Sequence, residues 1–350
     1  MSQFAGWLAQ HYRVNRPLSD YEMVSDVSNF DASGLKPIDQ GIIDLNPVFV
    51  EYVDRHFLYR GWGAMWGSLI VAMAFTFALA MIRVLWEVKA EGLRAVTAGD
   101  YYAIGFVVIL SLGAGALAYW MLLGRDVFRY QYYPIRFNRV SRVVHIFTGG
   151  KQGAISVPWD DIHFVIGRDK PIGPDEGSTY DLRGHVMRGD QVIHTFAVGS
   201  DSGSSPGVTL AHWEMIRRYM NGGGMDALPF PPLQLFMSTA VSFRNAFIIH
   251  VSSAGKGLML LALPITLPWA LFRYLTMKLC RKPQWPESVE EACQPGSKQP
   301  GALQAPAVYG RVKRGGPKGD AMLSFWKDAI KEAKARDPEL RAQLYGRTPT

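Results

Sequence analysis

Two long stretches without charge limit what this chain can fold into more than any other feature. Residues 62–82 and 101–124 contain no charged residue, and charged residues lie close to both ends of each stretch. A helix crosses the hydrocarbon core of a bilayer with about 20 apolar residues, and it satisfies its own backbone polar groups where lipid offers no partner. Trp62 and Trp86 near the ends of the first stretch fit the aromatic belt of a membrane interface. We therefore expect transmembrane helices at 62–86 and 101–124 and not two core helices of a soluble domain.

The rest of the chain is long enough for one further domain of ordinary size. The sequence has 350 residues and a net charge of +7. A basic excess is typical of nucleic-acid-binding proteins, but membrane proteins also concentrate Lys and Arg on their cytoplasmic side. We favour the membrane explanation and expect no nucleic-acid partner. Cys280 and Cys293 are the only cysteines, too few for a disulfide framework or a cysteine-built zinc site, and we expect no metal and no cofactor.

The segments before the first apolar stretch are predicted to be polar and then helical. Residues 1–45 are polar and mildly acidic and lack a signal-peptide pattern, and we expect no packed element there beyond a short helix at 2–13. Asn46 followed by Pro47 is typical of a helix start. We therefore predict an interfacial helix at 46–61 that leads into the first membrane helix.

A strand-rich domain is predicted at residues 125–225. Two apolar runs, 132–137 and 140–147, flank a turn and indicate a strand pair. A clear alternation follows at 180–186, with Tyr180, Leu182 and Val186 on one face and Asp181, Arg183 and His185 on the other. An apolar stripe at helical spacing over 208–220 ends the domain. We expect a small antiparallel β-domain closed by one C-terminal helix.

Four further segments complete the predicted layout. We expect an interfacial helix at 232–251, because an arginine within it makes a full membrane crossing costly. Residues 257–277 are apolar but contain two prolines, and both a transmembrane and a re-entrant segment remain open. Residues 281–319 are rich in Pro, Gly, Gln and Ser and predict a disordered linker. Residues 320–345 predict a terminal amphipathic helix.

Charge near the ends of the apolar segments predicts an orientation. Cytoplasmic ends of membrane segments carry the excess of Lys and Arg. One side has nine such residues: Arg55, Arg60, Arg125, Arg129, Arg136, Arg139, Arg142, Arg244 and Lys256. The other side has six: Arg83, Lys89, Arg94, Lys278, Arg281 and Lys282. We expect the amino terminus and the β-domain in the cytoplasm; the basic tail would lie outside if residues 257–277 cross.

The segment VPWDDIHFVI, residues 157–166, carries a resemblance to known proteins. Together with the order of strands and one following helix, it resembles the pleckstrin-homology-like (PH-like) domains of bacterial membrane proteins, with Trp159, Asp160, Asp161 and Ile162 as the signature. The full layout is similar to an uncharacterised bacterial membrane-protein family found beside type VI secretion effector genes. The fold class that follows is a membrane α-helical hairpin plus an α+β part, a small antiparallel PH-like β-domain.

The resemblance implies a function as well as a fold. It implies a multi-pass protein of the bacterial inner membrane that acts by binding, as an accessory or immunity protein, to a secreted effector or a secretion component. It supplies no catalytic residues, and we expect a non-enzymatic protein that contacts membrane lipid and is compatible with a homo-oligomer.

A basic set on the predicted strand pair offers an alternative function. Arg136, Arg139, Arg142 and Lys151 lie on or just after these strands. Four cations near a bilayer can bind anionic head groups, each contributing on the order of 1 kcal/mol. The four residues fit a lipid-binding scaffold or sensor, and they fit equally well the ordinary excess of Lys and Arg on the cytoplasmic side. We keep both interpretations open.

Two patterns that suggest chemistry are rejected on physical grounds. Residues 203–207 read G-x-S-x-G, as in a hydrolase nucleophile elbow. However, Pro206 follows the central serine and has no N–H for an oxyanion hole. Asp160, Asp161 and His163 could bind a metal, but no second histidine lies at ligand spacing. We therefore predict no catalytic residue and no metal site.

Overall fold

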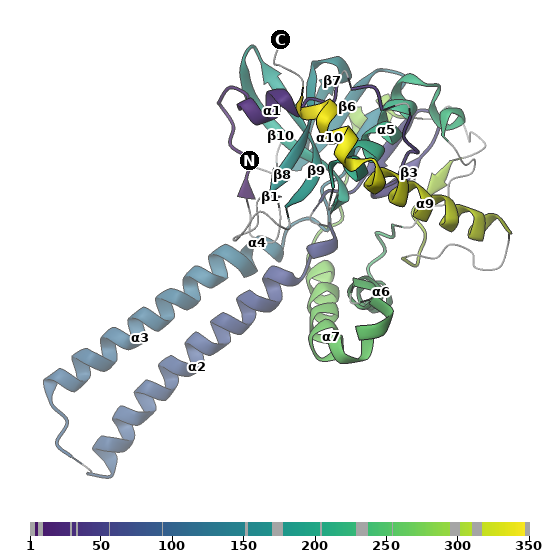
Figure 1. The fold of residues 1–350 in the computed structure, drawn as a ribbon. Helices are drawn as coiled ribbons and strands as arrows, with labels where there is room; N and C mark the ends of the chain where they lie inside the picture. Colours follow the sequence, from purple (N-terminus) through teal and green to yellow (C-terminus); the bar gives the residue numbers. More distant parts are fainter. Residues whose placement is uncertain are drawn as a thin grey trace. The chain divides into compact units, whose positions relative to one another are not determined.

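The computed structural model describes most of the chain and divides it into two compact units. It describes residues 4–5, 10–28, 30–32, 34–55, 57–92, 94–150, 153–169, 178–203, 205–228, 237–253, 255–294, 302–309 and 317–346. One unit, here called the globular unit, comprises residues 1–58, 132–240 and 282–350. The other, the helical unit, comprises residues 59–131 and 241–281. Figure 1 shows the helices and strands of both.

Antiparallel sheets form the framework of the globular unit. A six-stranded sheet has the order β11–β3–β4–β5–β6–β7, a three-stranded sheet has the order β10–β9–β8, and β1 pairs with β2. The strands are β1 (Phe4–Ala5), β2 (Gln10–His11), β3 (Ile42–Leu45), β4 (Phe49–Tyr52), β5 (Ile135–Asn138), β6 (Val143–Gly149), β7 (Gly153–Pro158), β8 (Ile162–Asp169), β9 (Thr179–Arg188), β10 (Gln191–Gly203) and β11 (Leu303–Gln304). The unit is therefore α+β, and the predicted strand pair is confirmed as β5 and β6.

The alternation predicted at 180–186 is present in β9. Leu182 and Val186 lie in the main apolar core, while Asp181, Arg183 and His185 take the opposite face because successive strand residues point to opposite sides. Both faces are buried, since Asp181 is only 2% exposed. The polar face must therefore be covered by another segment that supplies polar partners.

That cover is the N-terminal segment 10–28, which we call the strap. Its Asn15 N–H donates to Val192 O of β10 (2.7 Å), and its Val27 N–H donates to Phe164 O of β8 (2.9 Å). The strap therefore runs from one edge of the three-stranded sheet to the other, and α1 (Asp20–Val24) lies within it. The prediction that residues 1–45 contain no packed element beyond a short helix at 2–13 is wrong. Residues 4–5 and 10–11 are the strands β1 and β2, and the strap supplies Glu22 as a charged partner to His185 on the polar face of β9.

The interfacial helix predicted at 46–61 is also wrong. Residues 49–52 form β4, and residues 57–59 form the short 3-10 helix η1 (Phe57–Tyr59). Asn46 Oδ1 accepts the N–H groups of Val48 (2.9 Å) and Phe49 (3.0 Å). An asparagine that bonds its own following backbone makes a turn as readily as a helix cap, and here it joins β3 to β4.

Helix α5 (Pro206–Asn221) follows β10 and packs on the core. Ser205 caps it, its side chain accepting the Val208 N–H, and Pro206 occupies the first turn, where its missing N–H costs nothing. Trp213 and Ile216 of α5 are fully buried in the core cluster. The helix predicted at 208–220 is thus confirmed, and the short 3-10 helix η4 (Gly224–Ala227) comes after it.

The C-terminal part of the chain is ordered where the structure describes it. Helix α8 (Glu287–Ala292) and strand β11 occupy the predicted linker 281–319, so that prediction is wrong for 281–294 and 302–309. Val289 and Cys293 pack with Phe49. These apolar contacts hold α8 in place, and the polar composition of the segment does not predict them.

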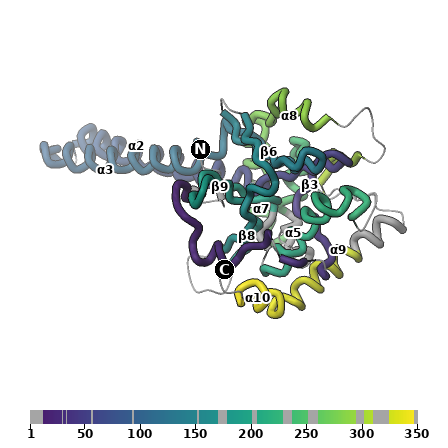
Figure 2. The backbone as a smooth tube through the Cα atoms, turned by 90° about the horizontal axis from the view of Figure 1, so that it is seen from above, coloured from purple at the N-terminus to yellow at the C-terminus, as the bar shows by residue number. Residues whose placement is uncertain are grey.

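The predicted terminal helix at 320–345 is two helices, α9 (Pro317–Ala335) and α10 (Asp337–Tyr345). Pro338 starts the second helix, where it is tolerated, and does not end the first. Asp337 Oδ1 accepts the N–H of Gly207 at the start of α5 (2.9 Å). Figure 2 shows α9 and α10, in yellow, running beside α5.

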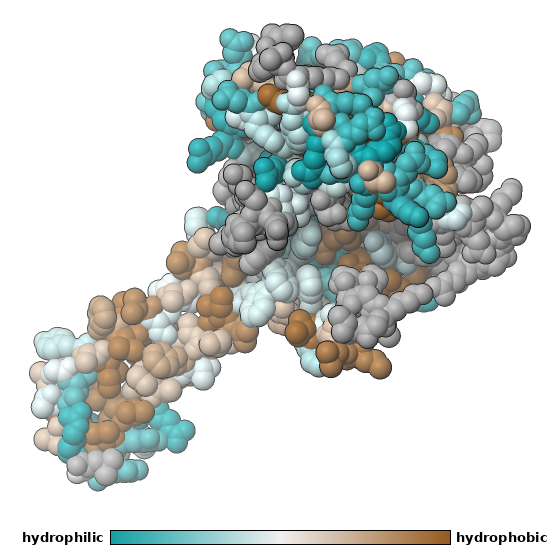
Figure 3. Space-filling model, in the orientation of Figure 1, coloured by the Kyte–Doolittle hydropathy of each residue, from teal (hydrophilic) through white to brown (hydrophobic). Residues whose placement is uncertain are grey.

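The helical unit contains a long antiparallel pair. Helix α2 (Trp62–Ala90) packs along α3 (Ala98–Ala118), which continues as the π-helix η2 (Tyr119–Leu123) and the short α4 (Gly124–Asp126). Small residues permit the contact: Ser111 Oγ donates to Ala74 O (2.8 Å) across the pair. Elsewhere large apolar side chains are exposed, as the brown surface of this pair in Figure 3 shows.

Helices α6 (Phe243–Ser253) and α7 (Gly255–Leu279) complete the helical unit. Helix α6 begins later than the predicted interfacial helix at 232–251, whose residues 232–236 lie outside the described part. Among the described residues, three helical stretches are long and apolar enough to cross a membrane: Phe57–Ala90, Ala98–Asp126 and Leu260–Leu279. These include the two predicted spans and most of the ambiguous third.

Candidate binding pocket

A cavity of about 410 Å³ opens where the strap, β8 and α5 meet in the globular unit. Its size falls in the range of ligand sites in proteins. Its lining combines aromatic and acidic side chains: Asp26, Ser28, Trp159, Asp160, Asp161, Ile162, His163, Phe164, Met187 and Trp213.

The aromatic part of the lining is rigid. Trp159 lies in the 3-10 helix η3 (Trp159–Asp161), and its backbone N–H donates to Arg142 O (2.8 Å). Its ring stacks on Trp213 with centroids 5.6 Å apart and planes at 8°. Phe164 lies against both rings, at 4.8 Å from Trp159 and 4.9 Å from Trp213. Three rings from three elements thus fix one another.

The acidic part of the lining is only partly neutralised. Arg142 Nη2 lies 2.7 Å from Asp160 Oδ1, and this hydrogen bond lowers the pKa of Asp160. Asp26 accepts the N–H of Ser28 (2.7 Å). Asp161 is exposed and makes no ion pair with any residue that the structure describes. The pocket therefore presents more negative than positive charge.

Two buried polar atoms of the lining residues also lack partners. The indole Nε1 of Trp213 and Nε2 of His163 have no hydrogen-bond partner within the described ranges, and Trp213 is 1% exposed. An unsatisfied buried group of this kind calls for an explanation, and the adjoining cavity offers space for a ligand or solvent.

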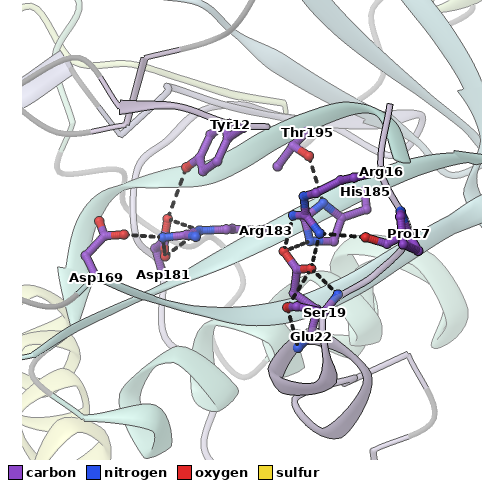
Figure 4. A network of polar contacts seen from close by, with 10 residues as sticks. All are labelled: Tyr12, Arg16, Pro17, Ser19, Glu22, Asp169, Asp181, Arg183, His185 and Thr195. Carbon is purple, nitrogen blue, oxygen red and sulfur yellow. Dashed lines mark hydrogen bonds and ion pairs between the residues drawn. The ribbon is translucent and has the colours of Figure 1, made fainter. Parts of the chain in front are cut away.

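A polar network next to the pocket holds the strap in place. His185 lies opposite His163 in the pairing of β8 with β9, and its Nε2 is 3.3 Å from Glu22 Oε1 of the strap. Glu22 also receives two hydrogen bonds of 2.6 Å from Arg16, as Figure 4 shows. Burial alone raises the pKa of Glu22, but His185 and Arg16 lower it well below its usual value. The ionised Glu22 is therefore a fixed anchor of the strap, which supplies Asp26 and Ser28 to the pocket.

Residues 114–297 match a family of unknown function, DUF6708. The chain belongs to the DUF6708 family. The matched DUF6708 region begins within α3 and ends just after α8, and it includes η3, β8 and α5 of the pocket but not the strap. The comparisons with curated proteins and with solved structures gave no match.

The basic set predicted on the DUF6708 strand pair does not form one exposed patch. Arg136 is 5% exposed and forms ion pairs with Glu51 (2.8 Å) and Glu290 (3.3 Å). Arg142 pairs with Asp160 at the pocket, and Arg139 donates to Pro47 O (3.3 Å). Lys151 lies outside the described residues. Arg136 is therefore not an exposed cation of this set, because its side chain pairs with the buried Glu51 and the exposed Glu290.

The predicted signature residues of this DUF6708 chain do come together. Trp159, Asp160, Asp161 and Ile162 all line the pocket. Sequence analysis named them for a resemblance and missed their role in a cavity, as well as Trp213 and the strap residue Asp26. The only local pattern in the sequence that indicates this pocket is the acidic pair Asp160 and Asp161 next to Trp159. The distant segments that complete the pocket give no local pattern.

The two rejected chemical patterns can also be located. Ser205, the central serine of the G-x-S-x-G pattern, is the N-cap of α5, where its side chain accepts the Val208 N–H. Within the described part of this DUF6708 chain, His, Cys, Asp and Glu side chains form no group of three or more suited to a metal.

Proposed function

We propose that this chain is a non-enzymatic binding protein, anchored in the bacterial inner membrane, whose globular unit captures a basic segment of a partner protein. The pocket of Trp159, Asp161 and Trp213 is the observation that carries the proposal. Carboxylates bind the ammonium or guanidinium group of a lysine or arginine through charge-assisted hydrogen bonds. Tryptophan faces attract the same cations.

The helical unit supports the membrane part of the proposal. Three helical stretches have the length and composition of membrane-crossing helices, and exposed side chains such as Phe106 and Ile109 are 67% and 72% accessible. Large apolar side chains in such number are unfavourable in water. The positive-inside rule favours a cytoplasmic globular unit.

The class of partner rests on the resemblance to membrane proteins encoded beside type VI secretion effectors. We propose that the partner is a secreted effector or a secretion component, and that the chain acts as an accessory or immunity protein. A PH-like fold for the strand-rich part belongs to the same proposal, since such folds host protein partners as well as lipids.

Peptide binding tests the pocket directly. The full chain is purified in detergent and titrated with fluorescein-labelled hexalysine, and binding is followed by fluorescence anisotropy. We expect Asp161→Asn to weaken binding several-fold. Asp190→Asn is the matched control, because Asp190 is exposed in the turn between β9 and β10, outside the pocket. Equal loss in both variants, or equal binding of hexaglutamate, contradicts the proposal.

Competition between cells tests the biological role. A strain lacking the chain is grown in contact with its parent, which retains the secretion system. An immunity protein predicts that the deletion strain is killed and that the full chain restores growth. An Asp161→Asn copy should restore growth poorly if the pocket binds the toxin. Survival of the deletion strain together with normal secretion contradicts both the immunity and the accessory role.

An anionic-lipid scaffold is the weaker alternative. It requires the basic set to face a membrane, and Arg136 is buried between Glu51 and Glu290. With Arg142 paired to Asp160, the described part of this set offers little free positive charge.

A further inference from the structure

We infer that α6 and α7 form a hairpin that enters and leaves the membrane from one side, the side that carries the globular unit. This inference rests on the membrane anchoring proposed above. It assigns the exposed apolar face of α7 to the acyl chains of a single leaflet and not to a third crossing.

The first step comes from the two chain segments that flank the hairpin. Before it, Thr239 hydrogen-bonds the Tyr132 side chain. After it, the Trp285 indole N–H donates to Glu51 (3.0 Å). All four residues belong to the globular unit, which folds on one side of a membrane. A chain that leaves and rejoins the same folded unit crosses an even number of times.

The second step is that α6 is too short and too polar to provide a return crossing. Its 11 residues extend about 16 Å at 1.5 Å per residue, whereas the hydrocarbon core is about 30 Å thick. Arg244 and Asn245 lie in its first turn, and such residues are costly within a span. Since α6 cannot cross, α7 cannot cross alone either.

Contacts within the helical unit agree with this topology. Phe243 at the start of α6 lies against Tyr274 near the end of α7, with ring centroids 6.1 Å apart. His250, further along α6, stacks on Trp269 at 4.0 Å. The two helices are therefore antiparallel in this region, and the start of α6 lies beside the end of α7.

The end of α7 is also tied to the end of the α2–α3 pair that adjoins the globular unit in sequence. Cys280 Sγ donates to Asp126 O (3.3 Å), and the Gln131 N–H donates to Arg281 O (2.9 Å). Asp126 in turn accepts the N–H of Gly61 at the start of α2 (2.9 Å). These residues thus meet at one membrane face.

The surface left for lipid is the outer side of α7. Leu260, Leu261 and Ile265 are 76%, 80% and 64% exposed, and Pro264 and Pro268 lie within the helix, where proline produces bends. An apolar helix with two internal prolines, paired with a short helix whose first turn carries Arg244 and Asn245, suits insertion at the interface.

This topology removes the conflict in the charge count. Lys278, Arg281 and Lys282 move to the side of the globular unit, and only Arg83, Lys89 and Arg94 remain opposite. The positive-inside imbalance then increases, and the basic tail shares the cytoplasmic side with the globular unit.

Cysteine labelling tests the inference in the full chain. Cys280 and Cys293 are replaced by serine, and single cysteines are introduced as Ser141→Cys in the globular unit, Ala95→Cys in the α2–α3 loop, and Ser252→Cys at the end of α6. A membrane-impermeant maleimide is added to spheroplasts and to inverted vesicles, and labelling in detergent verifies that each cysteine can react.

We expect Ala95→Cys to react only in spheroplasts and Ser141→Cys only in inverted vesicles. Ser252→Cys should react only in inverted vesicles or, if shielded by lipid, in neither. Labelling from the side of Ala95→Cys overturns the inference, either for Ser252→Cys or for a further single cysteine, Ser288→Cys in α8, which a third crossing by α7 would place on that side. Lys256→Cys replaces Ser252→Cys if that variant fails to accumulate. Labelling of Ala95→Cys and Ser141→Cys from the same side would instead reject the anchoring by α2 and α3.

Discussion

Arg55 Nη1 lies 2.9 Å from Asp181 Oδ2, deep in the globular unit. Arg55 comes just before residues 59–131, the first segment of the helical unit, and Asp181 lies on β9, which follows that segment. Arg183 also donates to Asp181 (3.0 Å), and Asp169 pairs with both arginines at 2.6 Å. Two cations and two carboxylates thus balance one another, and they join chain segments that lie before and after residues 59–131.

Asp181→Asn should strongly destabilise the globular unit. Burial raises the pKa of Asp181, but Arg183 and Arg55 lower it by more, so that it lies below its usual value and the carboxylate is ionised. Removing the charge leaves two buried guanidinium groups short of a partner, which typically costs 3–5 kcal/mol, and we expect a loss of about that size in the free energy of unfolding. Urea denaturation of the full chain, followed by tryptophan fluorescence, measures it.

The exposed pair of Asp160 and Arg142 is the control for this variant. Surface ion pairs contribute roughly 0–1 kcal/mol, so Asp160→Asn should shift the denaturation midpoint little. If Asp181→Asn and Asp160→Asn lower the free energy of unfolding by similar amounts, burial does not explain the stabilising effect of the Asp181 ion pairs.

His212→Phe should make the globular unit less sensitive to acid. Burial lowers the pKa of His212 to about 3, so in the folded state its imidazole stays neutral while the unfolded chain takes up a proton below pH 6.5. Above about pH 6.5 His212 is neutral in both states and does not oppose folding. As pH falls from 6.5 towards the folded-state pKa, protonation of the unfolded chain lowers the free energy of unfolding. Between pH 7 and pH 5 the loss is about 2 kcal/mol.

Phenylalanine cannot be protonated, and it retains a ring against Tyr52, whose centroid is 5.2 Å from that of His212. The difference in unfolding free energy between pH 7 and pH 5 should therefore shrink in the variant. An unchanged difference, measured by urea denaturation at both pH values, would assign the acid sensitivity to other groups.

Local patterns in the sequence predicted the parts of the fold that depend on local interactions. The alternation around Leu182 and Asp181 gave the faces of β9, and the uncharged stretches gave α2 and α3. Asn46 was misread because the same side chain caps a helix or a turn, and only pairing of β4 with β5 decides between them. The strap could not be predicted from local patterns, since its Glu22 pairs with His185, which is distant in the sequence. The pocket depends on the same kind of distant contact, between Trp159 and Trp213.

Arg136→Gln should destabilise the chain rather than abolish lipid binding. The Arg136 guanidinium lies over the rings of Phe49 (4.1 Å) and Trp285 (4.9 Å) and pairs with the buried Glu51. The variant leaves Glu51 without its buried partner, and we expect a loss on the order of 3 kcal/mol in unfolding free energy. Thermal denaturation in detergent measures the effect.

Arg139→Gln is the matched control, since Arg139 lies on the same hairpin and is half-buried, and its side chain donates a hydrogen bond to Pro47 O but forms no ion pair with another described residue. We expect this variant to denature close to the wild-type temperature. If Arg136→Gln melts normally but no longer binds vesicles containing anionic phosphatidylglycerol, the lipid-scaffold alternative regains support.

Gly67→Ala should weaken the α2–α3 pair, because a Cβ at Gly67 would lie 2.8 Å from the backbone nitrogen of Leu123. Contact with backbone cannot be relieved by a rotamer change, so the helices must separate locally. Gly113→Ala on the same pair is the control: a Cβ there meets nothing within 4 Å, and alanine favours a helix over glycine by about 1 kcal/mol. We expect the melting temperature in detergent, measured by fluorescence-detected size exclusion, to fall for Gly67→Ala and to hold or rise for Gly113→Ala. Because both substitutions add one methyl group to an apolar helix, shifts in the same direction would mean that close packing between α2 and α3 is not what stabilises this pair.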